Sequence, residues 1–211
     1  MIDFRLYLIT DRHQTAGRPL PAVVAEALRG GVQIVQLREK DLPASQLFEL
    51  AREMRDLTRR HGARLLINDR IDVALAVGAE GVHLGKAGLP VAQARRLVGP
   101  ERLIGYSAHS IEEALQAQRD GADFITFGPV YATPSKAAYG APLGCGLLAE
   151  AAGSLDIPVF ALGGVKKSSI PELLDSGCHG IALISAVIAA EDPAGETRDL
   201  LRTLEHYAPA V

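Results

Sequence analysis

The chain has 211 residues, of which 48% are hydrophobic and 22% charged, and its formal net charge is −3. This composition is typical of a globular chain with a large core, and it lacks the basic stripe that nucleic acid or a membrane surface would attract. Uncharged apolar runs stay short of the roughly 18 residues that span a bilayer. We therefore expect neither a nucleic acid nor a membrane as partner.

Cys145 and Cys178 lie far apart and have no metal-ligand spacing. A reduced, cytoplasmic protein is the simplest interpretation of that cysteine usage. Asp3 and Arg5 carry charge just where a strand pattern begins, so we do not interpret the N-terminal stretch as a signal peptide.

Short apolar runs recur along the chain, and each is followed by a helical pattern. From these runs we predict eight strands, at Leu6–Ile9, Gln33–Leu37, Leu65–Ile67, Gly81–Leu84, Leu103–Gly105, Phe124–Phe127, Val159–Leu162 and Ile181–Ile184.

Three of the predicted helices have distinct signals. From about Ala44 to His61, apolar residues recur on one face at i, i+3 and i+4 spacing. Ser110 precedes Glu113 by three residues, which is a capping-box pattern. Asp192 followed by Pro193 is typical of a helix start.

Eight strand–helix units in about 200 residues predict an α/β protein, a single (β/α)8 TIM barrel over residues 1–211. The strands are mostly apolar rather than alternating, as parallel strands covered by helices are. A doubly wound open sheet is the alternative fold. In a barrel, active-site residues lie in the loops that follow the strands, and most polar outliers of this sequence lie there.

The segment QLREK ends the second predicted strand and contains Gln36, Arg38 and Lys40. At i, i+2 and i+4 on a strand, these side chains would share one side. Two cations placed together favour a multiply charged anion such as pyrophosphate. The alternative is a pair of salt bridges to Glu39, Asp41 or a helix.

Asn68 and Asp69 follow the third predicted strand. A carboxylate beside phosphate oxygens suits Mg²⁺, which uses one or two carboxylates plus substrate oxygens. The alternative is an N-cap for a helix that begins near Ile71, a role for which Asp72 competes.

Two further segments are typical of phosphate sites. Gly163–Val165 follows the seventh strand and Ser185 follows the eighth, where barrels bind phosphate through backbone N–H groups. Thr133, Ser135 and Lys136 follow the sixth strand and offer two hydroxyls and an ammonium. The alternative for Gly163–Val165 is a tight turn without a ligand. The alternative for Thr133, Ser135 and Lys136 is a turn that needs polar residues. We interpret His109 as a structural hydrogen-bonder and His83 as a rim or core residue.

Eight segments in order, YLITD, QLREK, INDR, GVHLG, SAHS, GPVYATPSK, ALGGV and ALISA, span essentially the whole chain. Together they resemble thiamine phosphate synthase and the related thiazole tautomerase. The resemblance implies a (β/α)8 barrel. In the synthase, an aminopyrimidine methyl pyrophosphate loses pyrophosphate, and the nitrogen of a thiazole phosphate captures the resulting cation.

The resemblance also implies roles for individual residues. The pyrophosphate would be held by the catalytic set Arg38, Lys40, Asn68 and Lys136. Gln36 and Ser107 would orient the pyrimidine and the leaving group, and Asp69 would bind Mg²⁺. The thiazole phosphate site would be lined by Thr133, Ser135, Gly164, Ile184 and Ser185.

The sequence departs from the synthase pattern after HLG, where Lys86, Ala87 and Gly88 replace a Gln, an acidic residue and an Asp. That Asp is the second Mg²⁺ ligand, so one ligand is missing at Gly88, and Lys86 is a candidate substitute cation. The tautomerase also lacks this carboxylate, but its characterised form has a His where this chain has Pro129, and it tends to lose the carboxylate kept here as Asp69.

We predict a thiamine phosphate synthase, a transferase acting on two small phosphorylated substrates. The alternatives are a thiazole phosphate tautomerase and a non-catalytic regulatory barrel that binds thiazole or thiamine phosphate. The sequence leaves open whether the protein forms a homo-oligomer.

Overall fold

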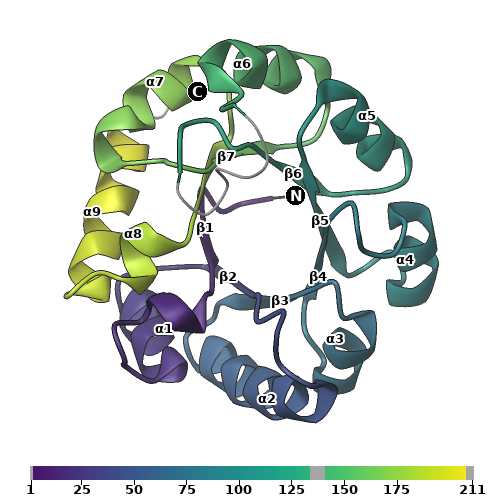
Figure 1. The fold of residues 1–211 in the computed structure, drawn as a ribbon, viewed down its shortest axis with the longest axis vertical. Helices are drawn as coiled ribbons and strands as arrows, with labels where there is room; N and C mark the ends of the chain where they lie inside the picture. The colour runs from purple at the N-terminus through teal and green to yellow at the C-terminus, as the bar shows by residue number, and fades with distance from the viewer. Residues whose placement is uncertain (1, 134–140, 208–211) are drawn as a thin grey trace.

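The computed structural model describes residues 2–133 and 141–207. Among these residues, eight strands form a closed barrel in chain order, and every neighbouring pair is parallel. The first strand pairs with the last through Leu6 opposite Ile181 and Leu8 opposite Leu183, which closes the ring (Figure 1). The predicted (β/α)8 barrel is confirmed, and the alternative of an open sheet is wrong.

The strands lie close to their predicted positions. They are β1 Leu6–Ile9, β2 Ile34–Leu37, β3 Arg64–Asn68, β4 Gly81–Leu84, β5 Leu103–Ala108, β6 Phe124–Phe127, β7 Val159–Leu162 and β8 Gly180–Leu183. β3 and β5 extend beyond the predicted ends, so Asn68 and Ser107 belong to strands rather than to loops. Ile184 lies outside β8.

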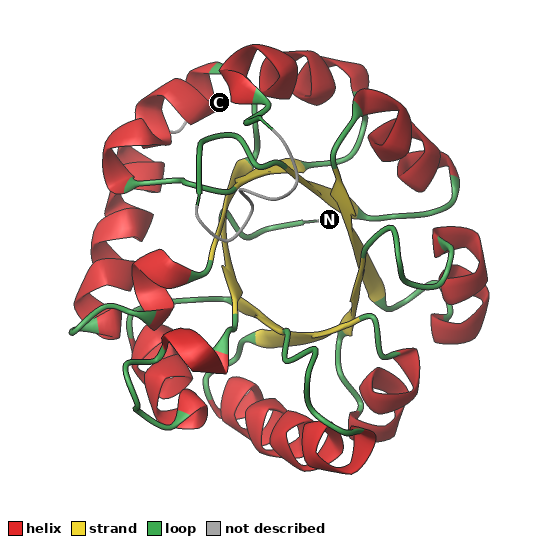
Figure 2. Cartoon of the chain, in the orientation of Figure 1, coloured by secondary structure: helices red, strands yellow, loops and turns green. Residues whose placement is uncertain are grey.

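The described helices surround the barrel (Figure 2). They are α1 Leu20–Arg29, α2 Ala44–Arg60, α3 Ile71–Val77, α4 Val91–Val98, α5 Ile111–Arg119, α6 Gly144–Ser154, α7 Ile170–Asp175, α8 Ser185–Ile188 and α9 Pro193–His206, with short 3₁₀ turns at η1 Arg12–Gln14 and η3 Lys167–Ser169. None of these helices is long and apolar enough to cross a membrane.

The two predicted helix caps are present. The Ser110 hydroxyl accepts a hydrogen bond from the Glu113 N–H at 3.2 Å and begins α5. The Asp192 carboxylate accepts one from the Gly195 N–H at 2.8 Å and begins α9. Each cap satisfies a backbone N–H that the helix itself leaves without a partner.

Aromatic rings fill one part of the barrel interior. Phe4 packs against Phe160 with ring centroids 5.1 Å apart and against the edge of Phe124 at 5.6 Å. Tyr7 contacts the same group, and all four rings are buried. A second, larger apolar layer lies between the strands and the helices. These two cores fix the strand ends, and so the loops that follow them, in space.

A close approach of two backbones makes Gly180 a test of this packing. A Cβ on Gly180 would lie 2.2 Å from the Arg5 carbonyl oxygen, where β8 meets the chain entering β1. We expect Gly180→Ala to lower the free energy of unfolding by about 2–3 kcal/mol.

Gly153 in α6 is the matched control, because a Cβ there meets nothing within 4 Å. Gly153→Ala should be neutral or stabilising by up to about 1 kcal/mol. Urea unfolding of both variants measures the difference, and equal stabilities would contradict the packing described for the β8–β1 closure.

Candidate active site

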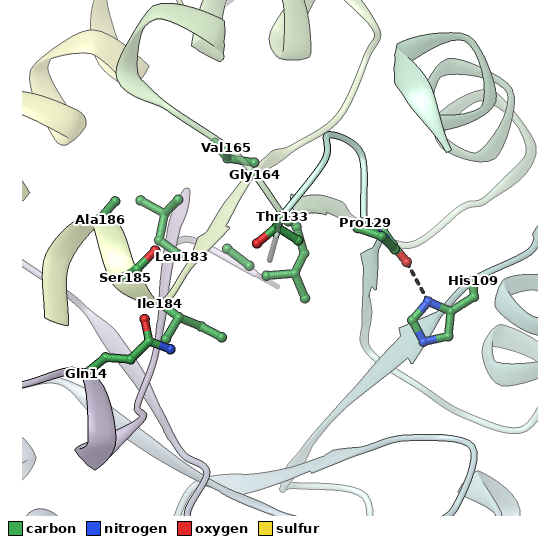
Figure 3. A pocket seen from close by; sticks show the side chains of 14 residues that line it. Gln14, His109, Pro129, Thr133, Gly164, Val165, Leu183, Ile184, Ser185 and Ala186 are labelled. Atoms are coloured by element: carbon green, nitrogen blue, oxygen red, sulfur yellow. Dashed lines mark hydrogen bonds between the residues drawn. The ribbon is translucent and has the colours of Figure 1, made fainter. Parts of the chain in front are cut away.

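Two cavities open at the carboxyl ends of the strands. The larger, about 390 Å³, lies between the loops after β6, β7 and β8 and is closed by Gln14 and His109. Figure 3 shows Gln14, Ile184 and Ser185 on one side, His109 and Pro129 on the other, with Thr133 and Gly164 between them. The smaller cavity, about 210 Å³, is lined by Lys40, Asn68 and Asp69 among others.

The strand argument for Lys40 was wrong, because β2 ends at Leu37. Gln36 alone of the three predicted residues lies in the strand, where its side chain is buried. Arg38 is half-buried in the following loop, and Lys40 is exposed. The loop brings Lys40 beside Asp69, with its Nζ 3.9 Å from Oδ2 of that carboxylate.

The neighbouring carboxylates do not neutralise Arg38. Glu39 is buried and accepts from the Thr10 hydroxyl at 2.6 Å and from Arg12 at 3.2 Å. Arg12 also donates to both oxygens of Asp41, and this guanidinium holds the pKa of Asp41 well below its usual range. Among the described residues no carboxylate forms a salt bridge with Arg38, so the salt-bridge interpretation of this residue is wrong.

Asn68 and Asp69 form a short polar pair beside Lys40. The Asn68 amide donates to Oδ2 of Asp69 at 2.8 Å, and the Gly85 N–H donates to Oδ1 at 3.3 Å. Arg70, not Asp69, is the N-cap residue of α3, and no side chain caps that helix. The N-cap interpretation of Asp69 is therefore wrong, and its carboxylate faces the smaller cavity.

A chain of buried polar groups runs across the barrel interior. The Gln36 amide donates to the Tyr7 hydroxyl at 2.9 Å, and that oxygen lies 3.1 Å from Nδ1 of His83. On the other side of the ring, Nε2 of His83 lies 2.9 Å from Oγ of Ser107, which is 3.1 Å from the hydroxyl of Thr126.

Burial keeps this chain uncharged. It lowers the pKa of His83 to about 3, with a smaller contribution from the positive charge of Arg38. It also raises the pKa of Tyr7 well above its usual range. The neutral chain holds Gln36 and Ser107, both predicted to contact substrate, in fixed orientations from the barrel interior.

Glycine is required where β7 ends. Gly163 and Gly164 both have positive φ, 95° and 66°, and a Cβ on Gly164 would lie 2.7 Å from Cβ of Tyr131. The loop after β6 packs directly over this turn, since Tyr131 donates its N–H to the Gly163 carbonyl at 3.0 Å.

The predicted phosphate residues lie together around the larger cavity. Gly164, Ile184, Ser185 and Thr133 all line it. Ile184 is the residue before α8, and Ser185 is the first residue of that helix. Ser135 and Lys136 lie outside the described residues.

Comparison with known proteins assigns this arrangement to a family. The model of the thiamine monophosphate synthase family matches residues 6–187. The chain belongs to the thiamine monophosphate synthase family.

Individual relatives agree across nearly the whole chain. A protein of Geobacter sulfurreducens is 63% identical over 203 residues, which cover 96% of this chain and 95% of the relative. The thiamine-phosphate synthase of Chloroflexus aurantiacus is 46% identical over 200 residues, with 95% and 92% covered. The thiamine phosphate pyrophosphorylase structure from Pyrococcus furiosus has a TM-score of 0.88, 39% identity and 97% coverage of both chains.

Residues 86–88 depart from the synthase pattern of this thiamine monophosphate synthase family, and Gly88 lies close to Asp69 in the structure. A Cβ on Gly88 would lie 2.6 Å from Oδ1 of Asp69, so a carboxylate at this position would stand beside Asp69. Lys86 does not replace it. Its Nζ donates to Glu113 on α5 at 3.0 Å, and its side chain is 79% exposed.

Glu39 and Asp69 both line the smaller cavity, but Arg12 already binds Glu39, so Asp69 is the candidate metal ligand there. The described residues contain no group of three or more His, Cys, Asp or Glu side chains that could hold an ion. Asp69 still faces a cavity, and Mg²⁺ commonly takes one or two carboxylates with the rest of its ligands from water and substrate phosphates. The donor set fits Mg²⁺ only if substrate oxygens and water complete it.

Sequence reasoning missed the two polar side chains of the larger cavity other than the hydroxyls, besides several apolar residues of its lining. Gln14 lies on η1 and donates to Asp11 at 2.7 Å, and nothing in the strand-end pattern marks it. His109 follows β5 in the SAHS segment, and its position after a strand was the available signal. Its predicted structural hydrogen bond is present, from Nδ1 to the Gly128 carbonyl.

The pKa of His83 predicts a pH dependence of stability. A histidine whose pKa falls from 6.5 to about 3 on folding stabilises the protein above pH 6.5, and that contribution is lost as the pH falls. Between pH 6.5 and 5 the loss from this group is about 2 kcal/mol.

We expect His83→Asn to be less stable than the wild type at pH 7 but to lose about 2 kcal/mol less between pH 6.5 and 5. Urea unfolding at the two pH values measures both slopes. Identical slopes would mean that folding does not lower the pKa of His83.

Proposed function

We propose that this chain is an active thiamine-phosphate synthase, joining an aminopyrimidine methyl pyrophosphate to a thiazole phosphate to give thiamine phosphate and pyrophosphate. The observation that carries the proposal is the half-buried Arg38, which no carboxylate of residues 2–133 and 141–207 pairs with, while Arg12 holds both Glu39 and Asp41. A partly buried, unpaired guanidinium is costly unless an anion joins it.

The smaller cavity supplies the pyrophosphate side of the proposal. Lys40 and Asn68, which line this cavity, would bind the leaving group together with Arg38 from the same loop as Lys40, and Asp69 would hold Mg²⁺ against its oxygens. When bound, the ion would stabilise the charge that develops on the departing pyrophosphate. Lys136, which lies outside the described residues, is proposed for the same group on the basis of the family motif.

The larger cavity supplies the thiazole side. Its lining is mostly apolar, which suits a methylated heteroaromatic ring, while Thr133, the Gly164 backbone and Ser185 would bind the phosphate. Ser135 is proposed for this site by its place in the same motif. The two cavities would hold the phosphate groups of the two substrates at the same end of the barrel.

The chemistry follows from this placement. The bond between the pyrimidine methylene and the pyrophosphate oxygen breaks, and its electron pair leaves with the pyrophosphate. The thiazole nitrogen then donates its lone pair to the methylene carbon. Fixed cations at the leaving group stabilise the transition state more than the ground state, since the negative charge is concentrated on the group as it leaves.

The tautomerase and the regulatory barrel explain less of the site. Neither needs an unpaired Arg38 beside Lys40 and Asp69, a cluster suited to pyrophosphate and Mg²⁺. Pro129 lines the larger cavity at the position where the tautomerase has its histidine.

The test is thiamine phosphate formation from the two purified substrates, with Mg²⁺ and with a chelator. We expect Mg²⁺-dependent product from the wild type. Arg38→Ala should lower kcat by about 10³-fold, the upper range for loss of one charge-stabilising group, with thiazole phosphate affinity within about 3-fold of wild type.

Isothermal calorimetry with thiazole phosphate provides the second readout. Absence of product from the wild type, with thiazole phosphate bound, would refute the synthase and favour the regulatory barrel or the tautomerase. Equal loss of binding and turnover in Arg38→Ala would contradict the division into two cavities.

Gly88 offers a direct test of the metal site proposed at Asp69. In Gly88→Asp the new carboxylate would stand against Asp69, so we expect a lower melting temperature without metal, a larger stabilisation by Mg²⁺ and tighter Mg²⁺ binding than in the wild type. Gly88→Asn is the control for the added bulk without the charge.

Thermal unfolding with and without Mg²⁺ measures these effects for all three proteins. If Gly88→Asp and Gly88→Asn respond to Mg²⁺ alike, the loop does not bring residue 88 to the metal.

A further inference from the structure

His109 is the only titratable side chain among the described residues that line the larger cavity. It lies between β5 and α5 and is exposed. The other lining side chains are apolar or carry hydroxyl and amide groups. A basic nitrogen in such surroundings calls for a role beyond the structural one predicted from sequence.

One hydrogen bond fixes which nitrogen of His109 carries the proton. Nδ1 lies 2.5 Å from the carbonyl oxygen of Gly128, and a carbonyl oxygen can only accept. Nδ1 must therefore be the donor, and in the neutral ring Nε2 keeps its lone pair. The hydrogen bond thus presets the imidazole as an acceptor at Nε2.

That lone pair has no partner among the described residues. The backbone of His109 is held separately, because its N–H donates to Oε2 of Glu113 at 3.0 Å while Oε1 of Glu113 pairs with Lys86. In Figure 3 the free edge of the ring faces the open mouth of the barrel, across from Gln14 and Ile184.

His109 follows β5, which in the ring order lies between β2 and β3 of the smaller cavity and β6 to β8 of the larger one. Ser107, proposed to face the pyrimidine, is two residues earlier in the chain, on β5. Thr133 and Gly164, proposed for the thiazole phosphate, line the same cavity as His109. A group reaching from this point meets the region in which the new bond would form.

We propose that Nε2 of His109 accepts a hydrogen bond from the exocyclic amino group of the pyrimidine and that His109 is a catalytic residue of the reaction. The proposal rests on the proposed synthase function. The reaction needs no net proton transfer, because the pyrophosphate leaves with the electrons of the broken bond and the thiazole lone pair forms the new one.

The acceptor would stabilise the positive charge that develops on the pyrimidine in the transition state. As the pyrophosphate leaves, positive charge spreads from the methylene onto the ring and the amino nitrogen, whose N–H groups become stronger donors. A neutral acceptor preset at this point stabilises the transition state more than the ground state. An imidazolium in the same place would repel the cation.

Two substitutions distinguish the hydrogen bond that Nε2 would accept from the hydrogen bond that Nδ1 donates to the Gly128 carbonyl. In His109→Asn the amide N–H can still donate to Gly128, but no atom reaches the position of Nε2. In His109→Gln the side-chain oxygen reaches toward that position, while the hydrogen bond to Gly128 is lost. We expect kcat to fall by about 10²-fold in the Asn variant and by about 10-fold or less in the Gln variant.

A second readout uses the pyrimidine pyrophosphate analogue that has hydrogen in place of the amino group. The wild-type preference for the amino substrate should shrink by about 10-fold or more in His109→Asn, because enzyme and substrate then no longer share the contact. Exposed His206 on α9 supplies the control, and His206→Asn should leave kcat and the preference unchanged.

The proposal is overturned if His109→Asn is as active as His109→Gln or more so. The activity would then depend on the hydrogen bond to the Gly128 carbonyl rather than on an acceptor at the position of Nε2. It is also overturned if the Asn variant keeps the full amino preference. Should that variant fail to bind thiazole phosphate, the Gln variant decides alone, with retained preference supporting the contact and lost preference excluding it. An inactive wild type would instead contradict the synthase function.

Discussion

The double pairing of Arg12 is the interaction on which the rest of the site depends. Glu39 and Asp41 flank Lys40 in the chain, and without another partner they would neutralise the cations beside them. Arg12, on η1 after β1, binds both carboxylates, and Thr10 adds a hydrogen bond to the buried Glu39. The positive charge of Arg38 is thereby left for an anion from solution, and Lys40 has only its 3.9 Å contact with Asp69 among the described carboxylates. The same short turn carries Gln14 into the lining of the larger cavity, while its Arg12 holds Glu39 of the smaller one.

A neutral interior supports this charged rim. The chain from Gln36 through Tyr7, His83 and Ser107 to Thr126 satisfies polar side chains that would otherwise be costly to bury. Its neutrality matters for a reaction that forms a cation, because a protonated histidine beneath the site would oppose it. The charged side chains therefore lie at the rim, where pyrophosphate would leave. Uncharged donors and acceptors lie deeper in the barrel, where the pyrimidine would bind.

Much of the fold was predictable because the barrel strands are short, apolar and followed by helices with distinct starts. Ser110 and Asp192 could be identified as caps from neighbouring residues alone. What escaped prediction depends on contacts between distant segments. The pairing of Arg12 with Glu39 and Asp41 spans 27 and 29 residues, and the Tyr7–His83 contact spans 76. The position of Lys40 also escaped prediction, since a loop rather than the expected strand carries it to Asp69.

We propose that two separate anion sites at the same end of the barrel hold the two substrates. A crystal structure with Mg²⁺, pyrophosphate and thiazole phosphate tests it most directly. The account predicts pyrophosphate against Arg38, Lys40 and Asn68, with the metal on Asp69, and the thiazole phosphate against Gly164 and Ser185. Pyrophosphate bound in the larger cavity, or both ligands competing for one cavity while Arg38 stays unoccupied, would contradict it.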